Sequence, residues 1–130
     1  MSQNTFFGGV DIGASATKVA IIDGEQQLAA SDVRKTGVSF EACAQEAMDS
    51  ALASCGLMLS DISRIISTGY GRHNVGFAHG TRTEIACHAR AAHHFFPKRI
   101  TIVDVGGQDN KIIQIDAAGR RENFKMNRKC

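Results

Sequence analysis

The first stretch that could do chemistry is the run from Asp11 to Lys18, which reads Asp-Ile-Gly-Ala-Ser-Ala-Thr-Lys. Because Gly13 and its small neighbours leave backbone N–H groups accessible, a turn here can bind phosphate oxygens. The hydroxyls and the lysine add further phosphate ligands, and the carboxylate of Asp11 suits the Mg²⁺ ion that a polyphosphate carries. Taken alone, this stretch fits equally well an ordinary β-hairpin whose turn is made of small residues and has no ligand.

A second acid–glycine stretch, from Asp104 to Lys111, repeats the pattern in the last third of the chain. Val10-Asp11-Ile12-Gly13 and Val103-Asp104-Val105-Gly106 each end an apolar run, and each precedes a polar turn and a lysine. The repeat suggests duplicated halves that face one another across a cleft. Two such turns and two acids around one phosphate chain would suit phosphoryl transfer, with the acids holding Mg²⁺ largely through its water molecules.

The elements that would position these residues follow from apolar periodicity and turn residues. Residues 6–13, 17–23 and 27–34 are predicted to form an antiparallel meander of strands, with Asp23-Gly24 at the second turn. A helix is predicted from Phe40 to Cys55, with Ser39 as its N-cap and Gly56 as its stop. The remaining predicted elements are strands at 62–68, 81–83, 100–105, 111–115 and 121–126 and a helix at 84–94.

Composition narrows the class of protein. The chain has 130 residues and a net charge of +2, which predicts about one globular domain and gives no reason to expect a nucleic-acid partner. No apolar run is long enough to predict a membrane span. Four cysteines are widely spread and form no C-x-x-C pair, so they are expected to be reduced, in the cytoplasm.

The chain contains neither of two common nucleotide-binding motifs. A P-loop sequence is absent, and Thr68-Gly69-Tyr70-Gly71-Arg72 fails as a dinucleotide fingerprint because Asn74 stands where a glycine is needed. That leaves the two-lobed nucleotide clamp of the actin and sugar-kinase type. The order of three strands, helix, strand and helix resembles the ribonuclease H-like lobe of that superfamily. We therefore expect an α/β fold of this type, followed by the first strands of an incomplete second lobe.

Five motifs, taken together, resemble one family. They are Gly9-Val10-Asp11-Ile12-Gly13, Thr68-Gly69-Tyr70-Gly71-Arg72, Thr83-Glu84-Ile85-Ala86-Cys87-His88-Ala89, Asp104-Val105-Gly106-Gly107-Gln108-Asp109 and Phe124-Lys125-Met126-Asn127-Arg128-Lys129-Cys130. Over nearly its whole length the chain resembles the ATP-dependent activators of 2-hydroxyacyl-CoA dehydratases and the related ATP-binding subunits of benzoyl-CoA reductase.

The resemblance implies an ATPase that is a homodimer, or a pseudo-dimer with a related subunit, and that holds one [4Fe–4S] cluster at the subunit interface. ATP binding and hydrolysis would drive an electron onto a partner dehydratase or reductase at low potential. By position, Cys130 would be a cluster ligand, and Asp11 and Asp104 would hold Mg²⁺ through water. The phosphate-binding residues would be Gly13, Ala14, Ser15, Ala16, Thr17 and Lys18 in one loop and Gly106, Gly107, Gln108 and Asp109 in the other.

Two residues are candidates for orienting the attacking water, Gln108 and Glu84. For Glu84, a role in capping its helix or in contacts between lobes is equally open. Which of the two residues acts, and whether the partner is a dehydratase or an aromatic-ring reductase, is not determined by the sequence.

Members of this family continue beyond the position of Cys130. The resemblance therefore predicts that the chain is an N-terminal portion, through truncation, a split gene or a frameshift, with residues 1–98 as the first lobe and 99–130 as the start of the second. A second cluster cysteine and the adenosine-binding segment would lie in the remaining part, so the chain alone is expected to be inactive and free of a cluster. A non-catalytic fragment and a sugar- or acetate-kinase-like phosphotransferase are the alternative functions.

Overall fold

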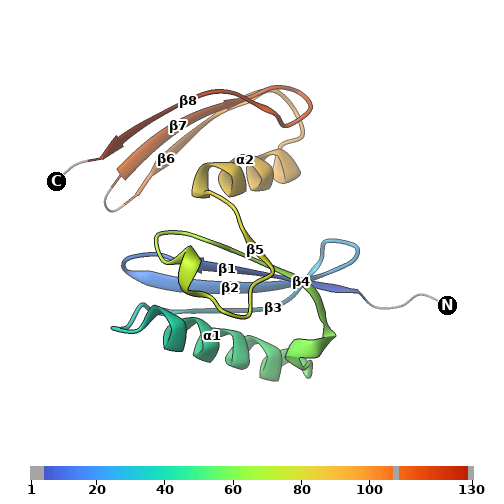
Figure 1. The fold of residues 1–130 in the computed structure, drawn as a ribbon. Coiled ribbons are helices and arrows are strands. Elements are labelled where there is room, and N and C mark those ends of the chain that lie inside the picture. Colours follow the sequence, from blue (N-terminus) through green and yellow to red (C-terminus); the bar gives the residue numbers. More distant parts are fainter. Residues whose placement is uncertain (1–4, 107–108, 129–130) are drawn as a thin grey trace. The chain divides into compact units, whose positions relative to one another are not determined.

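The computed structural model describes residues 5–106 and 109–128, and the chain divides into two compact units between Arg82 and Thr83 (Figure 1). The length of the chain had suggested about one domain. The expected start of a second lobe at residue 99 stays a prediction. The helix that precedes residue 99 packs against the strands that follow residue 99.

The first unit contains a five-stranded mixed sheet. Its strands are β1 (Phe6–Ile12), β2 (Ala16–Asp23), β3 (Leu28–Lys35), β4 (Ile62–Thr68) and β5 (Gly80–Thr81), in the order β3-β2-β1-β4-β5. The first three form the predicted antiparallel meander, and β4 pairs parallel to β1. This is the ribonuclease H-like arrangement expected from the order of elements.

Helix α1 (Phe40–Cys55) crosses from β3 to β4 and covers one face of this sheet (Figure 1). Its ends are those predicted, because Ser39 Oγ accepts a hydrogen bond from the N–H of Ala42 and Gly56 adopts the left-handed conformation. One face of α1 is fully buried against the sheet and forms the core of the unit. The buried residues are Cys43, Ala44, Ala47, Met48, Ala51 and Leu52 from the helix and Val10, Ile12, Val19 and Ile21 from the strands.

Two short 3₁₀ helices, η1 (Leu59–Asp61) and η2 (Arg72–Asn74), lie on either side of β4 in the sequence. The predicted strand at 81–83 is shorter and earlier than expected. Thr83 is not part of it, because its hydroxyl accepts from the N–H of Ala86 and so caps the next helix. The β2–β3 turn also differs in detail from an Asp23-Gly24 tip, since its left-handed residue is Gln26, at φ 65°.

The second unit consists of one helix and a three-stranded antiparallel sheet. Helix α2 (Glu84–Phe95) is followed by β6 (Ile100–Val105), β7 (Asp109–Ile115) and β8 (Arg121–Arg128), in the order β6-β7-β8. Ile85 and Ala89 of α2 pack with Ile113 and Ile115 of β7 to form a small separate core. Strands β7 and β8 are each longer by two residues than predicted, because they remain paired as far as Asp109 and Arg128.

Among the described residues, no helix is both long enough and apolar enough to cross a membrane.

Candidate functional site

The first acid–glycine stretch forms the hairpin between β1 and β2. Asp11 and Lys18 are cross-strand partners, and Lys18 Nζ lies 3.3 Å from Asp11 Oδ2. At the tip, the N–H of Gly13 donates to the carbonyl oxygen of Ala16 at 2.9 Å. A Cβ atom on Gly13 would lie 2.9 Å from that same oxygen, which is closer than side-chain carbons come. The turn in this form therefore requires glycine at position 13.

The second stretch forms the same hairpin between β6 and β7. Asp104 and Lys111 are cross-strand partners, with Lys111 Nζ 2.9 Å from Asp104 Oδ2. The N–H of Gly106 donates to the carbonyl oxygen of Asp109 at 2.8 Å, and a Cβ on Gly106 would lie 2.9 Å from that oxygen. The repeat seen in the sequence is thus a repeat of strand register and of turn geometry. Whether the two hairpins face one another stays a prediction.

The repeat also includes the turn at the other end of the second strand of each hairpin. The sequence analysis predicted a turn at Asp23 but missed its match with the turn at Asp116. In both the β2–β3 and the β7–β8 turn, one aspartate Oδ1 accepts two backbone hydrogen bonds, at 2.8 and 2.9 Å in the first and at 2.9 Å each in the second. Asp23 accepts from the N–H groups of Glu25 and Gln27. Asp116 accepts from those of Ala118 and Arg120. The offset from Asp23 to Asp116 equals that from Asp11 to Asp104, and this equality was the signal available in the sequence.

The two hairpins differ in how their lysines are held. Asp109 stands where the first hairpin has Ala16, and Asp109 Oδ1 lies 3.1 Å from Lys111 Nζ. With two carboxylate partners, the side chain of Lys111 is only 3% exposed, whereas that of Lys18 is 46% exposed. Lys18 is thus the lysine that a ligand can reach, and Lys111 is occupied by the protein's own acids.

The pKa values of the second hairpin reflect this ion pairing. Burial acts to lower the pKa of Lys111, but the hydrogen bonds to Asp104 and Asp109 outweigh it, and the pKa is raised. The hydrogen bond from Lys111 lowers the pKa of Asp104 against the opposing effect of burial. His88 of α2, whose Nδ1 lies 3.5 Å from Asp104 Oδ2, contributes further to this lowering. Asp104 is therefore held as a carboxylate.

The Thr68–Arg72 loop lies directly against the first hairpin. Gly69 has φ +91°, and a Cβ atom there would come within 2.5 Å of both Asp11 Oδ1 and the carbonyl oxygen of Ile12. The N–H of Gly71 donates to that same carbonyl oxygen at 3.0 Å. Arg72 does not reach outward, because its guanidinium donates to the carbonyl oxygen of Gly69 at 3.0 Å. The sequence identified this loop as one of the five family motifs without a role, and the structure places it as the support behind Asp11.

The other predicted site residues are placed as follows. The side chain of Thr17 is completely buried, and its hydroxyl lies 2.9 Å from that of Thr36. Glu84 is the first residue of α2 and is half-buried, next to the capping residue Thr83. Gly107, Gln108 and Cys130 lie outside the described residues.

The first hairpin fits a polyphosphate. Ala14 and Ser15 at its tip are exposed, and within the described part of the chain their N–H groups donate to no other backbone group. Lys18 adds a reachable cation, and Asp11 adds a carboxylate of the kind that Mg²⁺ accepts. In residues 5–106 and 109–128, no three His, Cys, Asp or Glu side chains converge to hold a metal directly.

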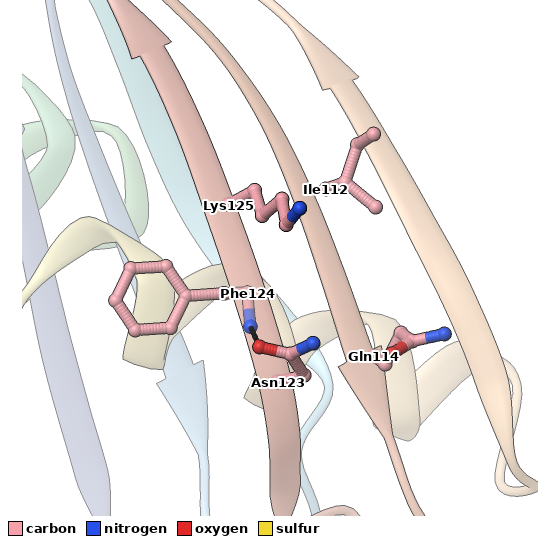
Figure 2. Close-up of a pocket in the computed structure, with 5 residues that line it drawn as sticks. All are labelled: Ile112, Gln114, Asn123, Phe124 and Lys125. Carbon is pink, nitrogen blue, oxygen red and sulfur yellow. Dashed lines mark hydrogen bonds between the residues drawn. The ribbon is translucent and has the colours of Figure 1, made fainter.

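A hollow of about 170 Å³ lies on the β7–β8 surface and is lined by Ile112, Gln114, Asn123, Phe124 and Lys125 (Figure 2). None of the predicted site residues that the structure describes lines it. Ile112 and its neighbours Val103 and Val105 are largely exposed, although their counterparts in the first hairpin, Val19, Val10 and Ile12, are buried in the core beneath α1. The hollow therefore lies on an exposed apolar face of the second sheet, away from the acid–lysine pair.

Comparison with known proteins identifies close relatives. The BadF/BadG/BcrA/BcrD ATPase family matches residues 9–130 of the chain. The activator of lactoyl-CoA dehydratase from Anaerotignum propionicum is 38% identical over 122 residues, which cover 94% of this chain and 47% of that protein.

Two solved structures are also similar. Component A of the (R)-2-hydroxyglutaryl-CoA dehydratase of Acidaminococcus fermentans superimposes with a TM-score of 0.89 at 30% identity, covering 97% of this chain and 48% of its own. The activator of the 2-hydroxyisocaproyl-CoA dehydratase from Clostridium difficile, solved with bound ADPNP, gives 0.88 at 35% identity, covering 97% and 47%. The chain thus spans about half the length of the relatives that it matches.

Proposed function

The chain belongs to the BadF/BadG/BcrA/BcrD ATPase family, and from this we propose that it is the part of a dehydratase activator that binds the phosphates of ATP. The observation that supports the proposal best is the pair of matching Asp–Gly–Lys hairpins. Both have the same register and the same turn, and the first has accessible N–H groups and a reachable lysine.

In this proposal the first hairpin is the principal phosphate ligand. The N–H groups at Ala14 and Ser15 would donate to phosphate oxygens, and Lys18 would leave Asp11 to contact the same anion. The Asp11–Lys18 separation of 3.3 Å belongs to an exposed pair, which is weak enough to be broken in this way. Asp11, once released, would be free to hold waters of a Mg²⁺ ion.

The second hairpin would supply a fixed negative charge. Asp104 and Asp109 share one permanent cation, Lys111, so the cluster carries an excess negative charge wherever the neighbouring imidazole of His88 is neutral. Such a charge favours a hydrated Mg²⁺ over a phosphate oxygen. Gly107 and Gln108 would complete the loop, and Gln108 or Glu84 would orient the water that attacks the terminal phosphate.

The finer steps rest on the family resemblance. ATP hydrolysis would be coupled to electron transfer from a [4Fe–4S] cluster to a dehydratase or a benzoyl-CoA reductase, in a homodimer or pseudo-dimer in the cytoplasm. Cys130 is the proposed cluster ligand in this chain, and thiolates are the usual ligands of such clusters. The cluster, ATP and Mg²⁺ are the cofactors of the complete assembly, and the chain alone is proposed to turn over little or no ATP.

Calorimetric titration of the chain with ATP in the presence and absence of Mg²⁺ tests the proposal. We expect Mg²⁺-dependent binding that Lys18→Met weakens by roughly tenfold or more, as for the loss of a charge-assisted hydrogen bond. Asp11→Asn should remove most of the Mg²⁺ dependence, and Lys35→Met, an exposed lysine on β3, should change nothing. Binding that is unaltered in both Lys18→Met and Asp11→Asn would refute a phosphate site at this hairpin.

The two alternatives predict different results in related assays. A sugar- or acetate-kinase-like phosphotransferase would transfer the labelled terminal phosphate of ATP to a hexose or to acetate, and the proposed activator would not. A non-catalytic fragment would show no heat of binding with ATP at any Mg²⁺ concentration.

A further inference from the structure

Thr36 follows β3 directly and belongs to none of the five sequence motifs, yet it makes three hydrogen bonds to the first acid–glycine turn. Its N–H donates to the carbonyl oxygen of Ser15 at 3.0 Å. Its hydroxyl donates to the carbonyl oxygen of Gly13 at 2.8 Å. The same hydroxyl lies 2.9 Å from the hydroxyl of Thr17. One residue, just past the end of the neighbouring strand β3, therefore contacts the turn at three points.

The direction of these hydrogen bonds is fixed by proton counting. A hydroxyl has a single proton, and the proton of Thr36 is directed at Gly13. Thr17 must then donate to Thr36, so that the buried hydroxyl of Thr17 is satisfied within the protein and is not available to a ligand. Thr36 links the interior of the hairpin to its tip.

These contacts determine where the amide groups of the turn point. In a trans peptide group the C=O and the N–H lie in one plane and point in opposite directions. Because the carbonyl oxygens of Gly13 and Ser15 point at Thr36, the N–H groups of Ala14 and Ala16, which share those two peptide planes, point away from it. Without the Thr36 hydroxyl, the carbonyl oxygen of Gly13 would lose this partner.

We propose that Thr36 is a positioning residue for the phosphate turn: it orients the Gly13–Ala14 peptide group so that the N–H of Ala14 points at a bound polyphosphate, and it fixes the Ser15–Ala16 peptide group beside it. The inference rests on the proposed function, because it assumes that the turn binds phosphate. The orientation of the two peptide planes, however, can be measured without any ligand.

Two substitutions separate the hydroxyl from the rest of the side chain. Thr36→Val keeps the shape of the residue and its N–H bond to Ser15 but removes both hydroxyl contacts. Thr36→Ser keeps the hydroxyl and removes only a methyl group. Thr101→Val, on an exposed strand position of the second unit, makes the same chemical change away from the turn.

The first measurement is amide hydrogen exchange in the ¹⁵N-labelled chain. In Thr36→Val, the Gly13 amide should exchange roughly fivefold or more faster, because losing the hydroxyl bond to the Gly13 carbonyl oxygen loosens the turn that the Gly13 N–H closes onto Ala16. Exchange in α1 should change by much less, which shows that the unit remains folded. Thr36→Ser and Thr101→Val should match the natural chain within about twofold.

The second measurement is a titration with Mg²⁺-tripolyphosphate, followed by the amide shifts of residues 13–18. Affinity should fall by roughly five- to tenfold in Thr36→Val and return in Thr36→Ser. A turn that exchanges and binds normally in Thr36→Val, or a Thr36→Ser variant as impaired as Thr36→Val, would overturn the proposal. If the natural chain binds no tripolyphosphate, the proposed phosphate site fails, whereas the exchange of Gly13 still decides whether Thr36 orders the turn.

Discussion

Lys111 donates a hydrogen bond to Asp104 at 2.9 Å from a side chain that is almost completely buried, whereas the equivalent pair in the first hairpin, Lys18 and Asp11, is exposed and 3.3 Å apart. The same two residue types at the same register thus have different environments. One difference is Asp109, which adds a second acceptor to Lys111 where the first hairpin has Ala16.

Removing each lysine should therefore have unequal effects on stability. Lys111→Met leaves two carboxylates without their cation and should lower the free energy of unfolding of the second unit by about 2–3 kcal/mol, somewhat less than for a fully buried pair. Lys18→Met should cost less than about 1 kcal/mol. Hydrogen exchange of β7 and β2 amides under increasing urea would report each unit separately. Equal losses of unfolding free energy in Lys111→Met and Lys18→Met would contradict the predicted difference between the two hairpins.

Gly69 and Gly56 provide a matched pair of left-handed glycines. Both have positive φ, but a Cβ on Gly69 would collide with Asp11 and Ile12, and one on Gly56 would meet nothing within 4 Å. Gly56→Ala should lower the free energy of unfolding by about 1 kcal/mol through backbone strain alone. Gly69→Ala should lower it by more and should also abolish Mg²⁺-ATP binding, because Asp11 must move. Urea unfolding together with calorimetry checks both effects, and normal binding by Gly69→Ala would show that the position of Asp11 is unimportant.

Most of the fold could be predicted because its signals are local. The caps of α1, Ser39 and Gly56, and the apolar spacing of the helix determine where it begins and ends. In both hairpins, acid–glycine turns in the sequence mark where the two strands meet, and the position of the turn sets which residues pair across them.

The supporting residues of the candidate site were not predictable in the same way. Thr36 contacts the turn through bonds that span 19 to 23 positions, and no property of an isolated threonine indicates such a partner. The position of Gly69 against Asp11 depends on β4 pairing parallel to β1, which only the folded sheet defines. The burial of Lys111 depends likewise on α2 and on two acids from different strands.

The turn aspartate Asp116 should make the second unit sensitive to acid. The backbone hydrogen bond from Arg120 lowers the pKa of Asp116 below 3.8, with burial opposing it and the N–H of Ala118 adding to it. Since the folded pKa is the lower one, the stabilisation is complete above pH 3.8 and is lost as the pH falls through the folded value. NMR titration of the carboxyl carbon should give a midpoint below 3.8. Asp116→Asn should remove this part of the acid response, and a midpoint at or above the ordinary value would contradict the prediction.

The constant offset between the two hairpins has a consequence for insertions and deletions. Three features recur at the same spacing in both hairpins: the acid–lysine pair, a β-bulge and the aspartate turn. The bulge lies between Ile21 and Ile22 in one and between Gln114 and Ile115 in the other. A residue added or lost anywhere between Asp11 and Asp23, or between Asp104 and Asp116, would break the register at one end or the other. Length variation among relatives should therefore be confined to the loops and helices that join the hairpins. The constant spacing from the acid to the turn aspartate should then help to align the sequences of even very distant family members.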